Sequence, residues 1–218
     1  MRSQNPKISG VILAAGKSAR IRPLKQLLPF RGKTILGQIV ESALSSSLCE
    51  VIAVLGHAAE QIRQVVDFGD AKVVVNREHE QGQSTSLQAG LSAVCDQSAA
   101  VMFILGDQPL ISAEVIDTLI EGYYPQRAPL VIPTFRGKRG NPVIVGRSLF
   151  HRLQSLTGDV GARALFEEYA EQIKEIEIEN ECIRFDIDTW EDYAKLKEIE
   201  DTPVSNRVKG SDLGPCQR

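Results

Sequence analysis

Residues 8–25 of the chain read Ile8-Ser-Gly-Val-Ile-Leu-Ala-Ala-Gly-Lys17-Ser-Ala-Arg20-Ile-Arg-Pro-Leu-Lys25. The apolar run Ile8–Leu13 predicts a buried strand, and the small residues after it let backbone N–H groups approach a ligand closely. Four cations follow the run, namely Lys17, Arg20, Arg22 and Lys25. This order predicts an anion site at the end of a strand, and a polyphosphate is the ligand that it favours.

The same stretch is also compatible with a turn that binds nothing. Strand-to-helix turns with glycine occur in many α/β proteins, and clusters of Lys and Arg often form a solvated face. The stretch contains neither Gly-x-x-x-x-Gly-Lys-Ser/Thr nor Gly-x-Gly-x-x-Gly. Kinase, simple NTPase and NAD-dependent dehydrogenase functions therefore lose their usual sequence support.

Length and composition indicate one globular domain. The 218 residues, 43% of them hydrophobic, are enough for one well-buried α/β domain, which we expect over residues 1–200 with a tail over 201–218. No apolar stretch approaches the roughly 20 residues that a membrane span needs. The N-terminal residues lack the apolar core and cleavage site of a signal peptide, so we expect a cytoplasmic protein without a membrane partner.

Charge is distributed unevenly along the chain. The first forty residues carry eight Lys or Arg and no acid, whereas fourteen of the 28 acids lie between Glu167 and Asp201. The formal net charge is -3 and aromatic residues make up 6%, with no basic stripe interleaved with aromatic side chains. Nucleic acid is therefore not an expected partner.

The cysteines and histidines are scattered along the sequence. Cys49, Cys95, Cys182 and Cys216 form no Cys-x-x-Cys pair, and we expect free thiols. The three histidines, His57, His79 and His151, show no metal-ligand spacing and are expected at the surface or in packing roles.

Apolar runs alternate with segments of helical spacing, which is typical of a parallel sheet. The fold class that we predict is α/β: a single Rossmann-like three-layer domain with a mostly parallel central sheet. We expect strands at 8–13, 51–55, 72–75, 100–105, 130–132 and 143–145, and helices at 35–45, 59–66, 84–94, 112–122, 161–169 and 190–199. The last helix has Thr189 and Asp192 in capping-box spacing. In such sheets ligands bind outside the carboxyl ends of the strands.

The segment Gly106-Asp107-Gln108-Pro109 directly follows the fourth of these runs. A carboxylate at a strand end beside an anion site predicts a ligand for Mg²⁺, because this ion binds few carboxylates together with phosphate oxygens. The alternative is that Asp107 only caps the turn before Pro109.

A second pair of carboxylates, Asp186 and Asp188, alternates along what we expect to be a strand, so that only one can join Asp107. Asp188 is preferred because it lies nearer the following helix. Two polar segments leave two interpretations open. Residues 80–90 suit hydrogen bonding to a base or sugar but also helix capping by Ser84 or Thr85, and residues 136–141 suit an anionic substrate but also a charged hairpin turn.

Six motifs together resemble the molybdenum cofactor cytidylyltransferases, which are nucleotidyltransferases related to molybdopterin guanylyltransferase. The resemblance spans residues 8–197 and implies a fold of the nucleotide-diphospho-sugar transferase type. Its motifs are residues 13–20 with Lys25, residues 81–90, Gly106-Asp-Gln-Pro109, Lys138-Arg-Gly-Asn-Pro142, Gly158-Asp-Val-Gly-Ala-Arg163 and Asp186-Ile-Asp-Thr189.

The resemblance implies transfer of CMP from CTP to the terminal phosphate of molybdopterin that carries molybdenum, with release of pyrophosphate. Positioning and charge neutralisation suffice for such a transfer, so no nucleophilic side chain is required. The roles carried over are catalytic for Arg20, Lys25 and Asp107; nucleotide binding for Leu13, Ala14, Ala15, Gly16, Ser84, Thr85, Ser86 and Gly106; acceptor binding for Arg139, Gly140, Asn141 and Pro142; and binding of Mg²⁺ for Asp107 and Asp188.

Two features bear on the choice of nucleotide. The Ala14-Ala15 pair resembles the branch that uses cytidine, because relatives that use guanosine usually have Gly in the second place. Arg22 stands where the family typically has Gly. An altered loop path and an added phosphate contact are both compatible with that departure.

Two further functions remain open from the sequence. One is a cytidylyltransferase for another phosphorylated acceptor, such as a sugar or alcohol phosphate. The other is a non-catalytic factor that delivers molybdopterin to a recipient molybdoenzyme of the xanthine dehydrogenase type. The pair of Asp107 and Asp188 favours catalysis, because a carrier has less need of a metal site.

Overall fold

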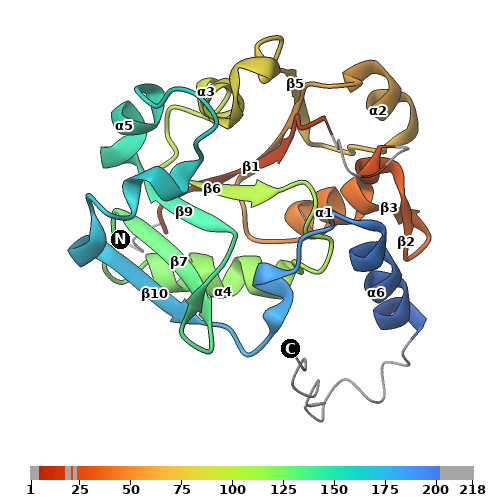
Figure 1. Ribbon diagram of the computed structural model, residues 1–218. Helices are drawn as coiled ribbons and strands as arrows, with labels where there is room; N and C mark the ends of the chain where they lie inside the picture. Colours follow the sequence, from red (N-terminus) through yellow and green to blue (C-terminus); the bar gives the residue numbers. More distant parts are fainter. Residues whose placement is uncertain (1–4, 18–20, 22–23, 202–218) are drawn as a thin grey trace.

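The computed structural model describes residues 5–17, 21 and 24–201 (Figure 1). Arg20 and Arg22, and the expected tail apart from Asp201, lie outside these residues. The elements of the main sheet are β1 (Ile8–Ala14), β4 (Glu50–Leu55), β5 (Lys72–Val75), β6 (Ala100–Leu105), β7 (Leu130–Phe135), β8 (Lys138–Arg139), β9 (Val143–Gly146) and β10 (Ile173–Glu177). A small hairpin is formed by β2 (Pro29–Phe30) and β3 (Lys33–Thr34).

The strands follow the order β10-β7-β9-β6-β1-β4-β5, with β8 paired to β7. Neighbouring strands are parallel for β1 with β4 and β6, β4 with β5, and β7 with β10, whereas β9 runs antiparallel to both β6 and β7. The mostly parallel sheet is thus confirmed. From β1 the chain continues to β4 and β5, which lie on one side of β1, and it then crosses to β6 on the other side of β1. This reversal of strand order creates a topological switch point at the carboxyl ends of β1 and β6.

Helices cover both faces of the sheet (Figure 1). Their bounds are α1 (Ile35–Leu44), α2 (Ala59–Val65), α3 (Gln83–Ser92), α4 (Ala113–Tyr123), α5 (Phe150–Gln154) and α6 (Trp190–Asp201). Side chains alternate between the two faces along each strand, so Ile12 of β1 packs with α1 and α4 while Val11 packs with α3 and α5. Two apolar cores result, one on each side of the sheet.

Short 3₁₀ turns lie mostly in the connections, at η1 (Lys25–Leu27), η2 (His79–Gln81), η3 (Arg147–Leu149), η4 (Ala162–Leu165), η5 (Ala170–Gln172) and η6 (Glu181–Arg184). The helix expected at 161–169 is therefore wrong. Ala162 and Leu165 are the buried residues of η4, and their spacing of three matches the three residues per turn of a 3₁₀ helix.

The expected strand through Asp186 and Asp188 is also wrong, because residues 185–189 form neither strand nor helix. The strand in this part of the chain is β10, which was not predicted. β10 lies at the edge of the sheet and carries three charged residues in Ile173-Lys-Glu-Ile-Glu177, so its apolar pattern is weak.

Ser112 caps α4 by accepting a hydrogen bond from the N–H of Val115. The expectation of free thiols is confirmed for Cys49, Cys95 and Cys182. Burial raises the pKa of the Cys182 thiol to about 11. Within the described residues, none of the helices is both long and apolar enough to cross a membrane.

Helix α3 packs against the sheet through Gly90. A Cβ atom at this position would overlap Cγ1 of Val11 and would come within 3.1 Å of Cγ2 of Val54. Both valines are fully buried and branched at Cβ, so their methyl groups have little freedom to move away.

We expect Gly90→Ala to destabilise the protein by about 1 kcal/mol. Alanine gains about 1 kcal/mol of helix propensity over glycine, but overpacking a core costs about 1–3 kcal/mol. The free energy of unfolding measured in urea tests this balance, and a variant more stable than the wild type would contradict the close packing.

Candidate active site

A cavity of about 630 Å³ opens at the switch point, beyond the carboxyl ends of β1 and β6. Its lining combines small residues, amides and a cluster of charges. The lining residues are Leu13, Ala14, Ala15, Gly16, Lys17, Lys25, Gln26, His79, Glu80, Gln81, Gly82, Gln83, Ser86, Leu105, Gly106, Asp107 and Asp159. The four residues at the end of β1 that we predicted for a nucleotide, 13–16, all belong to this lining.

The floor of the cavity depends on a close contact between two strand ends. The N–H of Gly106 donates to the carbonyl of Leu13 at 2.9 Å. A Cβ atom at Gly106 would lie 2.8 Å from Cβ of Ala14 and 2.8 Å from the oxygen of Leu13. Small side chains are therefore required here, and they leave the backbone accessible at the base of the cavity.

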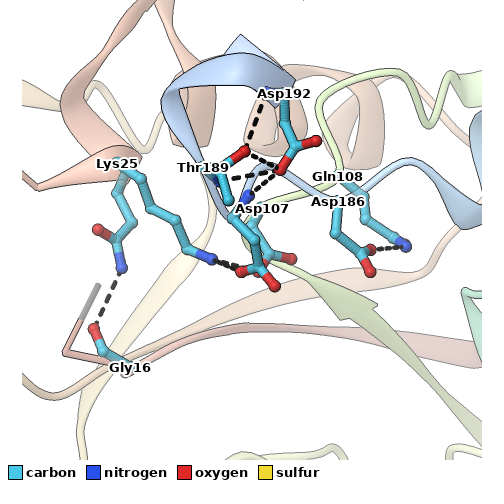
Figure 2. Close-up of polar contacts among 9 residues, drawn as sticks. Gly16, Lys25, Asp107, Gln108, Asp186, Thr189 and Asp192 are labelled. Carbon is cyan, nitrogen blue, oxygen red and sulfur yellow. Dashed lines mark hydrogen bonds and ion pairs between the residues drawn. The ribbon is translucent and has the colours of Figure 1, made fainter. Parts of the chain in front are cut away.

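Three charged groups meet at one end of the cavity. The ammonium of Lys25 lies 2.7 Å from Oδ2 of Asp107 and 3.0 Å from Oδ1 of Asp188. Figure 2 shows the Lys25 side chain reaching across from its own segment to Asp107. Burial would lower the pKa of Lys25, but the charges and hydrogen bonds of Asp107 and Asp188 outweigh it and raise the pKa. The ammonium is thus held in its charged form.

The carboxylates of Asp107 and Asp188 fit a divalent cation. Oδ1 of Asp107 is buried and has no hydrogen-bond partner within the part of the chain that the structure describes. Carboxylate oxygens are the donors that Mg²⁺ and Mn²⁺ prefer. Among the described residues, no group of three or more His, Cys, Asp or Glu could hold a metal ion. The site therefore suits an ion that takes its remaining ligands from phosphate and water.

Asp188 is held by the start of α6. The carboxylate of Asp192 accepts hydrogen bonds from the backbone N–H groups of Asp188 and Thr189, at 3.2 and 2.9 Å, and the hydroxyl of Thr189 accepts one from the N–H of Asp192 (Figure 2). This is the predicted capping box. On its other side, Ile187 donates its N–H to the carbonyl of Asp107 at 3.0 Å.

Asp186 points elsewhere and accepts a hydrogen bond from the amide of Gln108 (Figure 2). The residue as a whole is exposed, yet protein atoms surround its carboxyl group closely enough that burial raises its pKa. The negative charge of Asp107 raises that pKa further. Of the two carboxylates, the sequence favoured Asp188 for the metal, and it did not single out Gln108.

The polar wall of the cavity is formed by η2 and the start of α3. Of the three hydroxyl residues predicted to contact the nucleotide, Ser86 lines the cavity, whereas Ser84 and Thr85 are not among its lining residues. Successive side chains on a helix point about 100° apart, so three neighbours cannot all face one cavity. Neither Ser84 nor Thr85 is the N-cap of α3, which is Gly82.

Three lining residues were not predicted to contact a ligand. His79 was expected only at the surface or in packing, but it lines the cavity, with Nδ1 3.1 Å from the oxygen of Asn76. Gln26 donates to the carbonyl of Gly16 at 3.3 Å. Asp159 reaches the cavity from a distant loop and accepts the N–H of Gln83 at 3.3 Å. Its place in the Gly158–Arg163 motif was the one available signal.

Of the cations expected in the anion site, Lys17 is described by the structure and Arg20 is not. Lys17 lines the cavity and pairs with Glu80 at 2.7 Å, with both side chains more than half exposed. Such an exposed pair contributes little to stability, so it leaves Lys17 available to a ligand. Arg20 lies outside the described residues.

The residues predicted for the acceptor form a turn that contacts Ile183 and lies outside the lining of the cavity. Gly140 donates to the oxygen of Pro133 at 2.9 Å, and Asn141 donates to the oxygen of Ile183 at 2.8 Å. The guanidinium of Arg139 lies 2.7 Å from a carboxylate oxygen of Glu175 and 5.7 Å from the ring centre of Phe166. Pro142 follows Asn141 through a cis peptide bond.

An α/β sheet with this cavity and this charge cluster is the framework of a nucleotidyltransferase. Residues 10–173 match the family model described as MobA-like NTP transferase domain, and the chain belongs to that family. It is therefore a nucleotidyltransferase of the MobA-like kind, as the sequence motifs predicted.

Two similar proteins match this chain over nearly their whole length. A protein named nicotine blue oxidoreductase from Paenarthrobacter nicotinovorans is 29% identical over 203 residues, which is 88% of this chain and 97% of that protein. The crystal structure of a homologue of Mycobacterium tuberculosis Rv0371c, from Mycobacterium sp. strain JC1, is 31% identical with a TM-score of 0.79 and covers 88% of this chain and 98% of that one.

A further solved structure bears on the metal. Rv0371c from Mycobacterium tuberculosis H37Rv, in a complex with manganese, is 30% identical with a TM-score of 0.77. It covers 88% of this chain and 98% of that chain. A divalent cation in such a relative agrees with the donor set found here.

We expect Asp192→Ala to reduce stability by about 1 kcal/mol at neutral pH, the usual value of a helix cap. Hydrogen bonds from Thr189 and Asp188 outweigh burial and lower the pKa of Asp192, so its contribution is present above the ordinary aspartate pKa of about 3.9 and is lost as pH falls through the lowered value. Urea unfolding of wild type and variant at pH 7 and pH 3 measures this. Glu191→Ala, at the neighbouring exposed acid, is the control, and a difference as large at pH 3 as at pH 7 would contradict the cap.

Proposed function

We propose that this protein transfers CMP from CTP to the terminal phosphate of molybdopterin that carries molybdenum, and so forms molybdopterin cytosine dinucleotide and pyrophosphate. The observation that carries the proposal is the meeting of Lys25, Asp107 and Asp188 at the end of a cavity built on residues 13–16. It is supported by the family and by the narrower combination of motifs at 106–109, 138–142 and 158–163.

The reaction needs positioning and charge more than a nucleophilic side chain. An oxygen of the acceptor phosphate forms a bond to the α-phosphorus of CTP, and the bond from that phosphorus to the bridging oxygen of the β-phosphate breaks. The ammonium of Lys25, at the edge of the cavity, would bind phosphate oxygens as their charge increases. Arg20 is proposed to assist it from the same segment.

Asp107 and Asp188 would hold Mg²⁺, and the ion would supply neutralisation of phosphate charge. These two carboxylates belong to different segments, the end of β6 and the residues before α6, so both strand end and helix cap must be in place. Backbone groups of Ala15 and Gly16, which line the cavity, would contact the nucleotide phosphates.

The base is proposed to lie against Gln81, Gln83 and Ser86, which offer amide and hydroxyl groups on the cavity wall. These groups can hydrogen bond to the amino and carbonyl groups of a pyrimidine. The preference for cytidine rests on Ala14 and Ala15, the pair that resembles the branch that uses CTP.

The acceptor is proposed to bind beside residues 139–142. Arg139 offers a charge above the ring of Phe166, and its side chain is 41% exposed. A cation stacked on an aromatic ring suits a flat acceptor that bears a phosphate. Asn141 hydrogen bonds to Ile183, in the segment that leads to Asp188, and this contact supports an acceptor bound on that side.

The proposal is tested by incubating the protein with Mg²⁺, molybdopterin that carries molybdenum, and either CTP or GTP. We expect pyrophosphate and the dinucleotide with CTP only, as detected by mass spectrometry. Product from GTP would overturn the choice of nucleotide. Product only with a sugar or alcohol phosphate would overturn the acceptor, and binding of molybdopterin without turnover of CTP would indicate a delivery factor for a molybdoenzyme.

We expect Lys25→Ala to reduce turnover by about 100-fold or more while the protein stays folded, because the variant loses the ammonium that would neutralise phosphate charge as it increases. Pyrophosphate release and circular dichroism measure the two effects. Lys72→Ala is the matched control, since Lys72 also forms a close ion pair, 2.6 Å from Glu50, but does not line the cavity. Normal turnover of Lys25→Ala would exclude the phosphate role.

A further inference from the structure

The segment that carries Asp188 has little regular structure of its own. After the 3₁₀ turn η6 ends at Arg184, residues 185–189 form neither strand nor helix until α6 begins at Trp190. Ile183 and Ile187 are fully buried and attach the segment to the core. Apolar contacts of this kind are non-directional, so they do not by themselves set where a neighbouring carboxylate points.

Two consecutive residues at the end of β6 make directional contacts to this segment, in addition to the hydrogen bonds that join Ile183 to Asn141 and Asp188 to Asp192. The side-chain amide nitrogen of Gln108 donates to a carboxylate oxygen of Asp186 and, at 3.5 Å, to the carbonyl of Ile183. The carbonyl of Asp107 accepts the N–H of Ile187 at 3.0 Å. Asp107 and Gln108 thus hold the segment at residues 183, 186 and 187, directly before Asp188. Figure 2 shows the contact between Gln108 and Asp186.

The side chain of Gln108 is buried, and one of its polar atoms is unpaired. The residue is 1% exposed, and the oxygen of its side-chain amide is buried without a hydrogen-bond partner in the described part of the chain. Leaving a polar atom unpaired costs stability. A glutamine that served only to fill space would be replaced at lower cost by an apolar side chain.

We propose that Gln108 is a positioning residue for the metal site and that it acts through Asp186. By binding Asp186 it orients the segment so that the carboxylate of Asp188 faces that of Asp107. The inference rests on the proposed function, because it takes Asp107 and Asp188 as the metal ligands. Partners that orient metal ligands without touching the metal typically change its affinity about 10–100-fold when they are removed.

The test measures binding of Mn²⁺ alone to the whole protein, by the electron paramagnetic resonance signal of the free ion. Gln108→Met removes the donor and keeps the size and the local charge. Asp186→Asn keeps an acceptor for Gln108 and removes only the charge, whereas Asp186→Ala removes both. Gln88→Met is the matched control, since Gln88 also donates two amide hydrogen bonds, to the carbonyls of Gln154 and Leu156, away from the site.

We expect Gln108→Met and Asp186→Ala to weaken Mn²⁺ binding about 10-fold or more. Asp186→Asn should stay closer to the wild type than Asp186→Ala, and Gln88→Met should bind as the wild type does. The double variant Gln108→Met/Asp186→Ala should bind Mn²⁺ no more weakly than the weaker-binding of the two single variants, because both substitutions remove the same contact. Asp186 is exposed, so its variants test the contact even if Gln108→Met does not fold.

Wild-type affinity in Gln108→Met, or an equal loss in Gln88→Met, would overturn the positioning role. Additive losses in the double variant would overturn the action through Asp186. Asp107→Asn separates these results from a failure of the metal site itself. If the wild type does not bind Mn²⁺, or Asp107→Asn binds it equally well, the proposed metal site fails and the positioning role fails with it.

Discussion

The ammonium of Lys25, shared between the carboxylates of Asp107 and Asp188, is the interaction on which the site depends. The three groups come from the turn after β1, the end of β6 and the start of α6, and all three are partly shielded from water. Charges in such surroundings are stable only when they compensate one another. The sheet must therefore bring β1 beside β6, and the last segment must return across their ends.

Close packing at the strand ends makes this convergence possible. Gly106 and Ala14 bring the backbones of β6 and β1 together, and the same small residues form the floor of the cavity. The features that permit packing and those that permit ligand binding thus coincide. On the other side of the carboxylates, Ile183 joins the segment of Asp188 to the turn at 139–142.

Prediction from the sequence succeeded where a pattern is local. The buried strands at 8–13 and 100–105 follow from continuous apolar runs, and the capping box at Thr189 and Asp192 follows from their spacing. Prediction failed where packing against residues distant in the chain determines the local structure. Within residues 161–169 the 3₁₀ turn covers only 162–165, where the buried residues Ala162 and Leu165 lie three apart, and β10 is an edge strand whose charges obscure its pattern.

The sequence by itself determined the fold class, the family motifs and the position of Asp107 at a strand end, because strand periodicity and strand-end chemistry are carried by adjacent residues. Only the tertiary structure decided that Lys25 pairs with both carboxylates, that Asp186 bonds to Gln108, and that Asp159 and His79 line the cavity. Most of these contacts join residues that are distant in the chain. His79 differs, because it belongs to the 3₁₀ turn η2, directly before α3. Spacing along a sequence carries no distance between separate segments, and the packing of the sheet supplies it.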